Sequence, residues 1–252
     1  MSIEEVSIEK ERLKGRLWIP KKYNKGIIIT HSWRNDYDEP MCKDAAEFFY
    51  KNNYAVLQFL LPGHGENQPP EELCFRTSIQ QAILATEFLK QKTGIKKIGG
   101  FGISLGAAAI GFLPEKIVNA QVLISYDVLK NPGKGFDRYK KEFETRKKEL
   151  ETKGYVTLTS STGRGKFRMG KEFIEEKTLH GKEFTKKFVE SKTPTLLVQG
   201  TGDNRFNETF YDFIEESNSE SLIVKEMDHN ILNPKHRKLI LENSKAFFEK
   251  YL

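Results

Sequence analysis

The chain has 252 residues, of which 38% are hydrophobic and 30% charged, and its formal net charge is +6. These proportions are typical of a globular protein, and the length predicts one large domain or one domain with an insertion. Lysines are spread along the chain and do not form one basic block, so nucleic acid is not an expected partner.

The beginning of the chain and its cysteines bear on the cellular compartment. Residues 1–14 are charged throughout, so we expect no secretory signal there, and no apolar run reaches membrane-spanning length. Cys42 and Cys74 lie in different segments, and neither has a neighbouring Cys or His at ligand spacing. We therefore expect a cytoplasmic protein without a metal site, in which both thiols are ordinary packing residues.

Strand and helix patterns alternate along the first half of the chain. Residues 6–20 predict a hairpin or edge strands around Gly15. Asp36 and Glu39 have the spacing of a capping box at the start of a helix. Buried strands are predicted at 26–30, 54–61, 95–101 and 121–125, and helices at 36–53, 77–93 and from 104 onwards.

The same alternation returns near the end, with strands predicted at 195–199 and 221–225 and helices at 207–216 and 234–252. Repeated strand–helix units predict an α/β fold with a parallel sheet that helices cover on both faces. Residues 1–128 and 192–252 are therefore predicted to form the core domain.

Residues 129–191 interrupt this order, because they are rich in charge and contain no buried-strand pattern. We predict a small cap inserted after the sixth strand, with a helix, a hairpin and further helical cover. The hairpin is predicted from strands at 155–159 and 166–169. The apolar residues that define the helical faces of the cap are Phe136, Tyr139, Phe143, Leu150, Phe173, Ile174, Leu179, Phe184 and Phe188. Most are expected to seal the cap onto the core, and a few to line a substrate pocket.

One motif carries most of the chemical information. Gly102-Ile103-Ser104-Leu105-Gly106 follows a predicted buried strand and precedes a small-residue helix, which is the pattern of a nucleophile elbow. The turn is tight, so its flanking positions require glycine. A dinucleotide site is the alternative, because Gly100, Gly102 and Gly106 approach that fingerprint and Asp127 follows. However, the third glycine comes one residue late, and the motif lies at mid-chain.

A serine nucleophile requires a base, and the base requires a carboxylate. Asp203 follows the strand at 195–199 and His229 follows the last strand, so both belong at the carboxyl edge of a parallel sheet. The order Ser104, Asp203, His229 is that of a hydrolase of this architecture. Two alternatives remain open: Asp203 could cap the following helix, and Asp228 could be the acid.

Backbone N–H groups are expected to stabilise the oxyanion of the reaction. Leu105, directly after the serine, supplies one, and Trp33, in the loop after the strand at 26–30, supplies the other. Arg34, His31 and Arg205 are candidate substrate-binding residues. The arginines could hold a carboxylate or phosphate of a substrate, or they could simply face solvent.

At this point the chain resembles the α/β-hydrolase family over nearly its full length. The matching pieces are His31-Ser32-Trp33, Pro62-Gly63-His64-Gly65, the motif around Ser104, Gly200-Thr201-Gly202-Asp203 and Asp228-His229. The Pro-Gly-His-Gly loop looks like the subgroup that contains monoacylglycerol lipases and cinnamoyl or feruloyl esterases. The resemblance implies an eight-stranded, mostly parallel sheet and hydrolysis without a cofactor.

The chain departs from the family pattern at two loops. Ser32 stands where the family usually has glycine in the oxyanion loop. Leu61 precedes Pro-Gly-His-Gly and Glu66-Asn67 follow it, where other residue types are usual. His64 is interpreted as a structural loop residue.

The sequence therefore predicts a serine hydrolase that cleaves a small or medium carboxylic ester with an apolar or aromatic group. The expected partners are this ester and a second copy of the chain in a homodimer. A thioesterase, acyltransferase or peptidase would use the same triad. A protein that binds a ligand in the same pocket without turnover is the alternative of another class.

Overall fold

The computed structural model describes residues 2–8, 13–65, 69–126, 144–159, 166–179, 181–203, 214–217 and 219–252. Within these residues eight strands form one sheet in the order β1-β2-β4-β3-β5-β6-β9-β10. The strands β1 (Ser2–Ile8) and β2 (Leu13–Ile19) pair antiparallel, and β2 is also antiparallel to β4. The remaining neighbours pair in parallel. The predicted eight-stranded, mostly parallel sheet is therefore confirmed.

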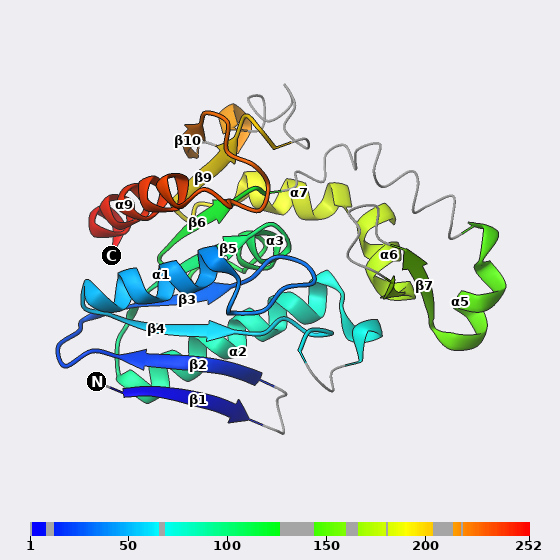
Figure 1. Ribbon diagram of the computed structural model, residues 1–252, viewed down its shortest axis with the longest axis horizontal. Coiled ribbons are helices and arrows are strands. Elements are labelled where there is room, and N and C mark those ends of the chain that lie inside the picture. The colour runs from blue at the N-terminus through cyan, green and yellow to red at the C-terminus, as the bar shows by residue number, and fades with distance from the viewer. Residues whose placement is uncertain are drawn as a thin grey trace.

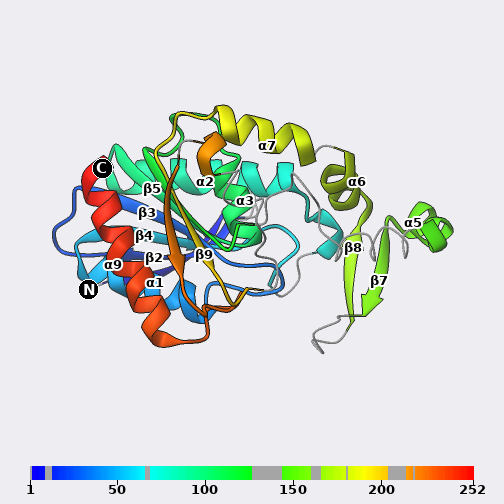
Figure 2. The same cartoon turned by 90° about the horizontal axis from the view of Figure 1, so that it is seen from above.

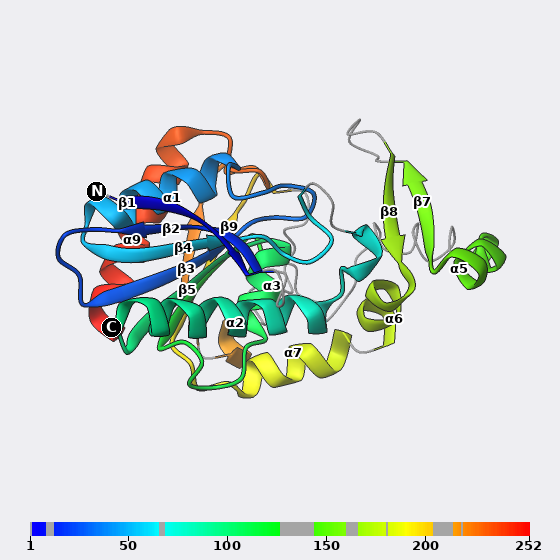
Figure 3. The ribbon, with the colours of Figure 1, turned by 90° about the horizontal axis from the view of Figure 1, so that it is seen from below.

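Helices cover both faces of this sheet. The parallel strands are β3 (Lys25–Thr30), β4 (Tyr54–Phe59), β5 (Lys97–Ile103), β6 (Ala120–Ile124), β9 (Thr195–Gly200) and β10 (Glu220–Val224). The helices α1 (Pro40–Lys51) and α9 (Pro234–Tyr251) lie on one face (Figure 2). The helices α2 (Phe75–Thr93) and α3 (Leu105–Gly111) lie on the other, where α7 (Gly181–Glu190) lies alongside α2 (Figure 3).

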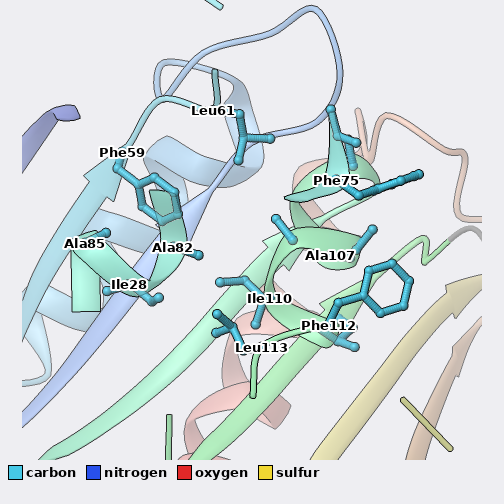
Figure 4. Close-up of a cluster of buried hydrophobic side chains, with 14 of the residues drawn as sticks. Ile28, Phe59, Leu61, Phe75, Ala82, Ala85, Ala107, Ile110, Phe112 and Leu113 are labelled. Carbon is cyan, nitrogen blue, oxygen red and sulfur yellow. The ribbon is translucent and has the colours of Figure 1, made fainter. Parts of the chain in front are cut away.

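The isoleucine run of β3 shows how the sequence builds two apolar layers. Successive strand residues point to opposite faces. Ile27 and Ile29 join the layer beneath α1 and α9, whereas Ile28 joins the layer beneath α2 and α3, and all three are fully buried. Each contributes about 2 kcal/mol by leaving water. Figure 4 shows Ile28 in its layer with Phe59 of β4 and Ala82 of α2.

The segment between β6 and β9 carries α5 (Lys147–Lys153), β7 (Tyr155–Thr159), β8 (Lys166–Gly170), α6 (Lys171–Leu179) and α7. β7 and β8 pair antiparallel, which confirms the predicted hairpin. α5, β7 and α6 lie beyond the carboxyl ends of β3 and β4 (Figure 1). The predicted aromatic face at Phe136, Tyr139 and Phe143 lies outside the described residues. Whether this segment is a separate cap domain stays a prediction.

Three details of the sequence prediction are wrong or need new bounds. The strands predicted around Gly15 are the antiparallel pair β1 and β2, but Gly15 itself lies inside β2, where a Cβ would lie 2.2 Å from the carbonyl oxygen of Gln58 on β4. The first helix starts at Pro40, not at 36, because proline at the first helical position restricts the residue before it to extended backbone. Glu39 makes no side-chain capping bond, so the predicted capping box is absent.

The remaining boundaries move by small amounts. α2 starts two residues before the predicted position, since Cys74 and Thr77 form its capping box. Both cysteines are free and buried. The helix expected at 207–216 lies outside the described residues except for its last three, which are helical. No helix in the described part of the chain is long and apolar enough to cross a bilayer.

Candidate active site

The turn after β5 holds Ser104 in an unusual backbone conformation. Its φ is 52° and its ψ is −107°, and α3 starts at the next residue. A Cβ on Gly102 would lie 2.4 Å from the carbonyl oxygen of Gly106. A Cβ on Gly106 would lie 2.6 Å from the carbonyl oxygens of Thr30 and His31. Backbone occupies these places, so glycine is required on both sides of the serine, as the motif predicted.

Three side chains from distant segments form a continuous series of hydrogen bonds. Ser104 Oγ lies 3.1 Å from His229 Nε2, and His229 Nδ1 lies 2.7 Å from Asp203 Oδ2. The Asp203 side chain is 1% exposed and the His229 side chain 17%. A carboxylate only accepts, so the Nδ1 proton of His229 points to Asp203. Nε2 is then free to accept from the Ser104 hydroxyl.

The two candidate acids have different surroundings. Gln199, at the end of β9, donates through Nε2 to Asp203 Oδ2 at 3.1 Å, and this second bond fixes the carboxylate toward His229. Asp228 instead accepts from the backbone N–H groups of Asn230 and Leu232. The structure therefore places Asp203 against the histidine, while Asp228 stabilises the turn of its own loop.

The expected oxyanion donors lie on two segments that contact each other. Leu105 is the first residue of α3 and follows Ser104 directly. The loop after β3, which contains Trp33, is tied to this turn because Gly106 N–H donates to the carbonyl oxygen of His31 at 3.1 Å. The backbone N–H and the hydroxyl of Ser32 both donate to Glu39 Oε2, at 2.9 and 3.0 Å.

His31 is fully buried, and both of its ring nitrogens bond to backbone. Nε2 accepts from Leu61 N–H at 3.1 Å, so the proton is on Nδ1, which donates to the carbonyl oxygen of Ser32 at 2.8 Å. Burial, with a smaller effect from His64, lowers the pKa of His31 to about 3. His31 therefore joins the loops after β3 and β4 as a neutral ring, and no ring nitrogen faces a substrate.

His64 is bonded in the same way. Its Nε2 accepts from Arg34 N–H at 2.9 Å and its Nδ1 donates to the carbonyl oxygen of Pro62 at 3.0 Å. Burial lowers the pKa of His64. Arg34 is half-buried and has a φ of 65°. Arg205, the other candidate substrate-binding arginine, lies outside the described residues.

The inserted segment reaches the site through aromatic contacts. The ring of Phe173, on α6, lies 6.0 Å from the ring of Trp33 and 5.3 Å from that of Phe75, centroid to centroid. Trp33 is half-buried and Phe173 is 4% exposed. The face of the site next to the oxyanion loop is therefore aromatic.

A cleft of about 600 Å³ lies between α2 and the base of the hairpin. Glu71, Glu72 and Glu172 contribute to its lining, and Ser104, Asp203 and His229 do not. In the described part of the chain, no three His, Cys, Asp or Glu side chains form a group that could hold a metal ion.

Sequence reasoning missed two residues of the site, Gln199 and Glu39. A polar residue at the carboxyl end of a buried strand was the available signal for Gln199. Glu39 was assigned to a capping box, because its spacing from Asp36 fits one.

Comparisons with known proteins identify the fold. No protein-family model matches the chain, and no curated protein matches it in sequence. Solved structures do match. Est1E from Butyrivibrio proteoclasticus is 17% identical with a TM-score of 0.69, covering 100% of this chain and 99% of its own. The α/β hydrolase GrgF from Penicillium sp. sh18 is 17% identical with a TM-score of 0.74, covering 99% of this chain and 98% of its own. The dienelactone hydrolase from Anabaena variabilis ATCC 29413 is 17% identical with a TM-score of 0.65, and the match covers 100% of both chains. The chain therefore has the α/β-hydrolase fold.

Proposed function

We propose that this α/β-hydrolase-fold protein hydrolyses carboxylic esters through an acyl-enzyme, with Ser104 as nucleophile, His229 as base and Asp203 as acid. The observation that carries the proposal is the series of hydrogen bonds from Ser104 Oγ through the His229 ring to Asp203 Oδ2, at 3.1 and 2.7 Å. This arrangement lets the imidazole take the hydroxyl proton as the oxygen attacks.

In the first half of the reaction, Ser104 Oγ bonds to the acyl carbon and its proton passes to His229 Nε2. The N–H groups of Leu105 and Trp33 stabilise the negative oxygen of the tetrahedral intermediate. The imidazolium formed is stabilised by Asp203, and it donates its proton to the departing alcohol. Water then attacks the acyl-enzyme, with His229 again as base, and releases the acid.

An ester with an apolar or aromatic group fits this site best. The ring of Trp33, half-buried in the oxyanion loop and packed against Phe173, offers a face for such a group. Among the structural neighbours, Est1E has been solved with ferulic acid bound, with 18% identity, a TM-score of 0.71 and 98% of both chains covered. This neighbour supports esters of aromatic acids as the first compound class to assay.

The test is the loss of turnover when the Ser104 hydroxyl is removed. Ser104→Ala is expected to lower kcat for p-nitrophenyl esters on the order of a million-fold, because nucleophile and base act as one unit. Ser244→Ala is the matched control, since Ser244 is buried in α9 and its hydroxyl donates to the carbonyl oxygen of Ile240 in the same helix. The control is expected to keep normal kcat.

A fluorophosphonate probe separates the proposal from ligand binding without turnover. Labelling of the wild type at Ser104 supports the hydrolase, and absence of labelling in folded protein contradicts it. Undiminished ester hydrolysis by Ser104→Ala would also contradict it. A panel of esters, thioesters and amides distinguishes the esterase from a thioesterase, acyltransferase or peptidase.

A further inference from the structure

Glu39 is a buried carboxylate that the reaction as described does not use. The residue is 7% exposed and precedes α1, but its side chain does not cap that helix. Burial raises the pKa of Glu39, and the hydrogen bonds from Ser32 offset part of this rise. A buried carboxylate is costly unless its hydrogen bonds compensate, so the position of these bonds indicates what Glu39 does.

Two of these bonds come from the residue that departs from the family pattern, and Asn35 also bonds to Glu39. Ser32 donates to Glu39 Oε2 through both its N–H and its hydroxyl. Asn35 Nδ2 donates to the same hydroxyl oxygen at 2.6 Å. The extra hydroxyl that serine brings in place of glycine is therefore fully bonded within the loop.

The other end of the same residue is also held. The carbonyl oxygen of Ser32 accepts from His31 Nδ1 at 2.8 Å and from Asn35 N–H at 3.2 Å. The peptide bond is planar and trans, so fixing this carbonyl fixes the N–H of Trp33 in the opposite direction. Glu39 fixes the peptide before Ser32, and His31 fixes the peptide after it.

We propose that Glu39 is a positioning residue for the oxyanion loop, which holds Ser32 so that the Trp33 N–H keeps the direction that the reaction needs. The inference rests on the proposed hydrolase function. Glu39 acts through Ser32 and does not touch the substrate.

The test compares two variants of Glu39, which precedes α1, with one variant of Glu47 inside α1. Glu39→Ala removes the acceptor and is expected to lower kcat for a p-nitrophenyl ester by about 10- to 100-fold, less than or similar to the loss of an oxyanion donor, with KM nearly unchanged. Glu39→Gln keeps an oxygen for the two Ser32 donors and is expected to restore most of this kcat. Glu47→Ala, at a half-buried position of α1 paired with Lys51, is the matched control and is expected to behave as wild type.

A second measurement does not depend on turnover. Hydrogen exchange of the peptide that contains residues 31–35 is expected to accelerate in Glu39→Ala and not in Glu47→Ala. Should Glu39→Ala fold poorly, Glu39→Asp serves instead. It is expected to show the same loss of kcat, because its side chain is one methylene shorter and its carboxylate no longer reaches Ser32.

The outcomes separate the two proposals. Normal kcat in folded Glu39→Ala or Glu39→Asp, in a protein whose wild type hydrolyses esters, overturns the positioning role. An equal loss in Glu39→Gln and Glu39→Ala would overturn the role of the acceptor oxygen. A wild type without ester turnover defeats the hydrolase proposal, and unchanged exchange at 31–35 in Glu39→Ala then defeats the positioning of the loop independently.

Discussion

Ser104 has a positive φ, which costs a residue other than glycine on the order of 1–3 kcal/mol and persists only where the surroundings enforce it. Here the atoms that enforce this conformation belong to the backbone of neighbouring segments. The carbonyl oxygens of Thr30 and His31 lie where a side chain on Gly106 would be, and the carbonyl of Gly106 lies where one on Gly102 would be. The close approach of β3 to the start of α3 therefore holds the serine in this turn.

This contact makes Gly106→Ala a severe change. The new Cβ meets backbone that cannot move away, so we expect a loss of about 3 kcal/mol or more in the free energy of unfolding, and with it loss of ester turnover. Gly94→Ala is the control, because Gly94 has a φ of 72° but nothing within 4 Å of its Cβ position. It should cost about 1 kcal/mol and keep turnover. Urea unfolding and kcat together check both; equal costs at the two positions would contradict the steric argument.

Among the elements, α6 bonds to the core through a buried carboxylate, in addition to the packing of Phe173. Glu176, 3% exposed, accepts from the N–H groups of Phe75 and Arg76 at the start of α2. The first N–H groups of a helix lack partners within the helix, and a negative charge at this end is favourable. Residues 100 positions apart in sequence thus hold the inserted segment against the core.

Removing this carboxylate should loosen the inserted segment. Glu176→Ala is expected to cost about 2 kcal/mol, because it leaves buried N–H groups without their acceptor. It should also speed proteolysis within residues 144–190. The neighbouring Glu175→Ala is the matched control, since Glu175 is half exposed and pairs with Lys171 on its own helix. If both changes lower the melting temperature equally, the bond from Glu176 to the start of α2 does not stabilise the protein as proposed.

For the molecule as a whole, the two neutral histidines between the loops predict sensitivity to acid. The unfolded chain protonates His31 near pH 6.5, whereas the folded chain does so only near pH 3. The unfolded state therefore binds more protons between these values, and the free energy of unfolding falls as the pH falls. The loss from His31 is on the order of 5 kcal/mol between pH 7 and pH 3, and His64 acts in the same direction.

Urea unfolding at several pH values between 7 and 4 tests this prediction. The wild type should lose stability steeply below about pH 6.5. His31→Gln should be less stable at pH 7, because it loses a buried ring, but its stability should fall less steeply with acid. A slope in His31→Gln as steep as that of the wild type would reject the role assigned to this ring.

The sequence by itself determined the alternating strands and helices, the elbow around Ser104 and the strand ends after which Asp203 and His229 follow. These features depend on local pattern: buried strands are short apolar runs, and a tight turn requires glycine. The eight-stranded sheet followed, because repeated strand–helix units have few ways to bury their apolar faces.

Only the tertiary structure decided which partners the polar side chains take. It placed Asp203 and not Asp228 beside His229, turned Glu39 from a capping residue toward Ser32, and buried His31 between two loops. The bond from Arg76 N–H at the start of α2 to Glu176 belongs to the same group. Each of these bonds depends on how loops and helices meet in space, and hydrophobic periodicity along the chain carries no information about the direction in which a buried polar group points.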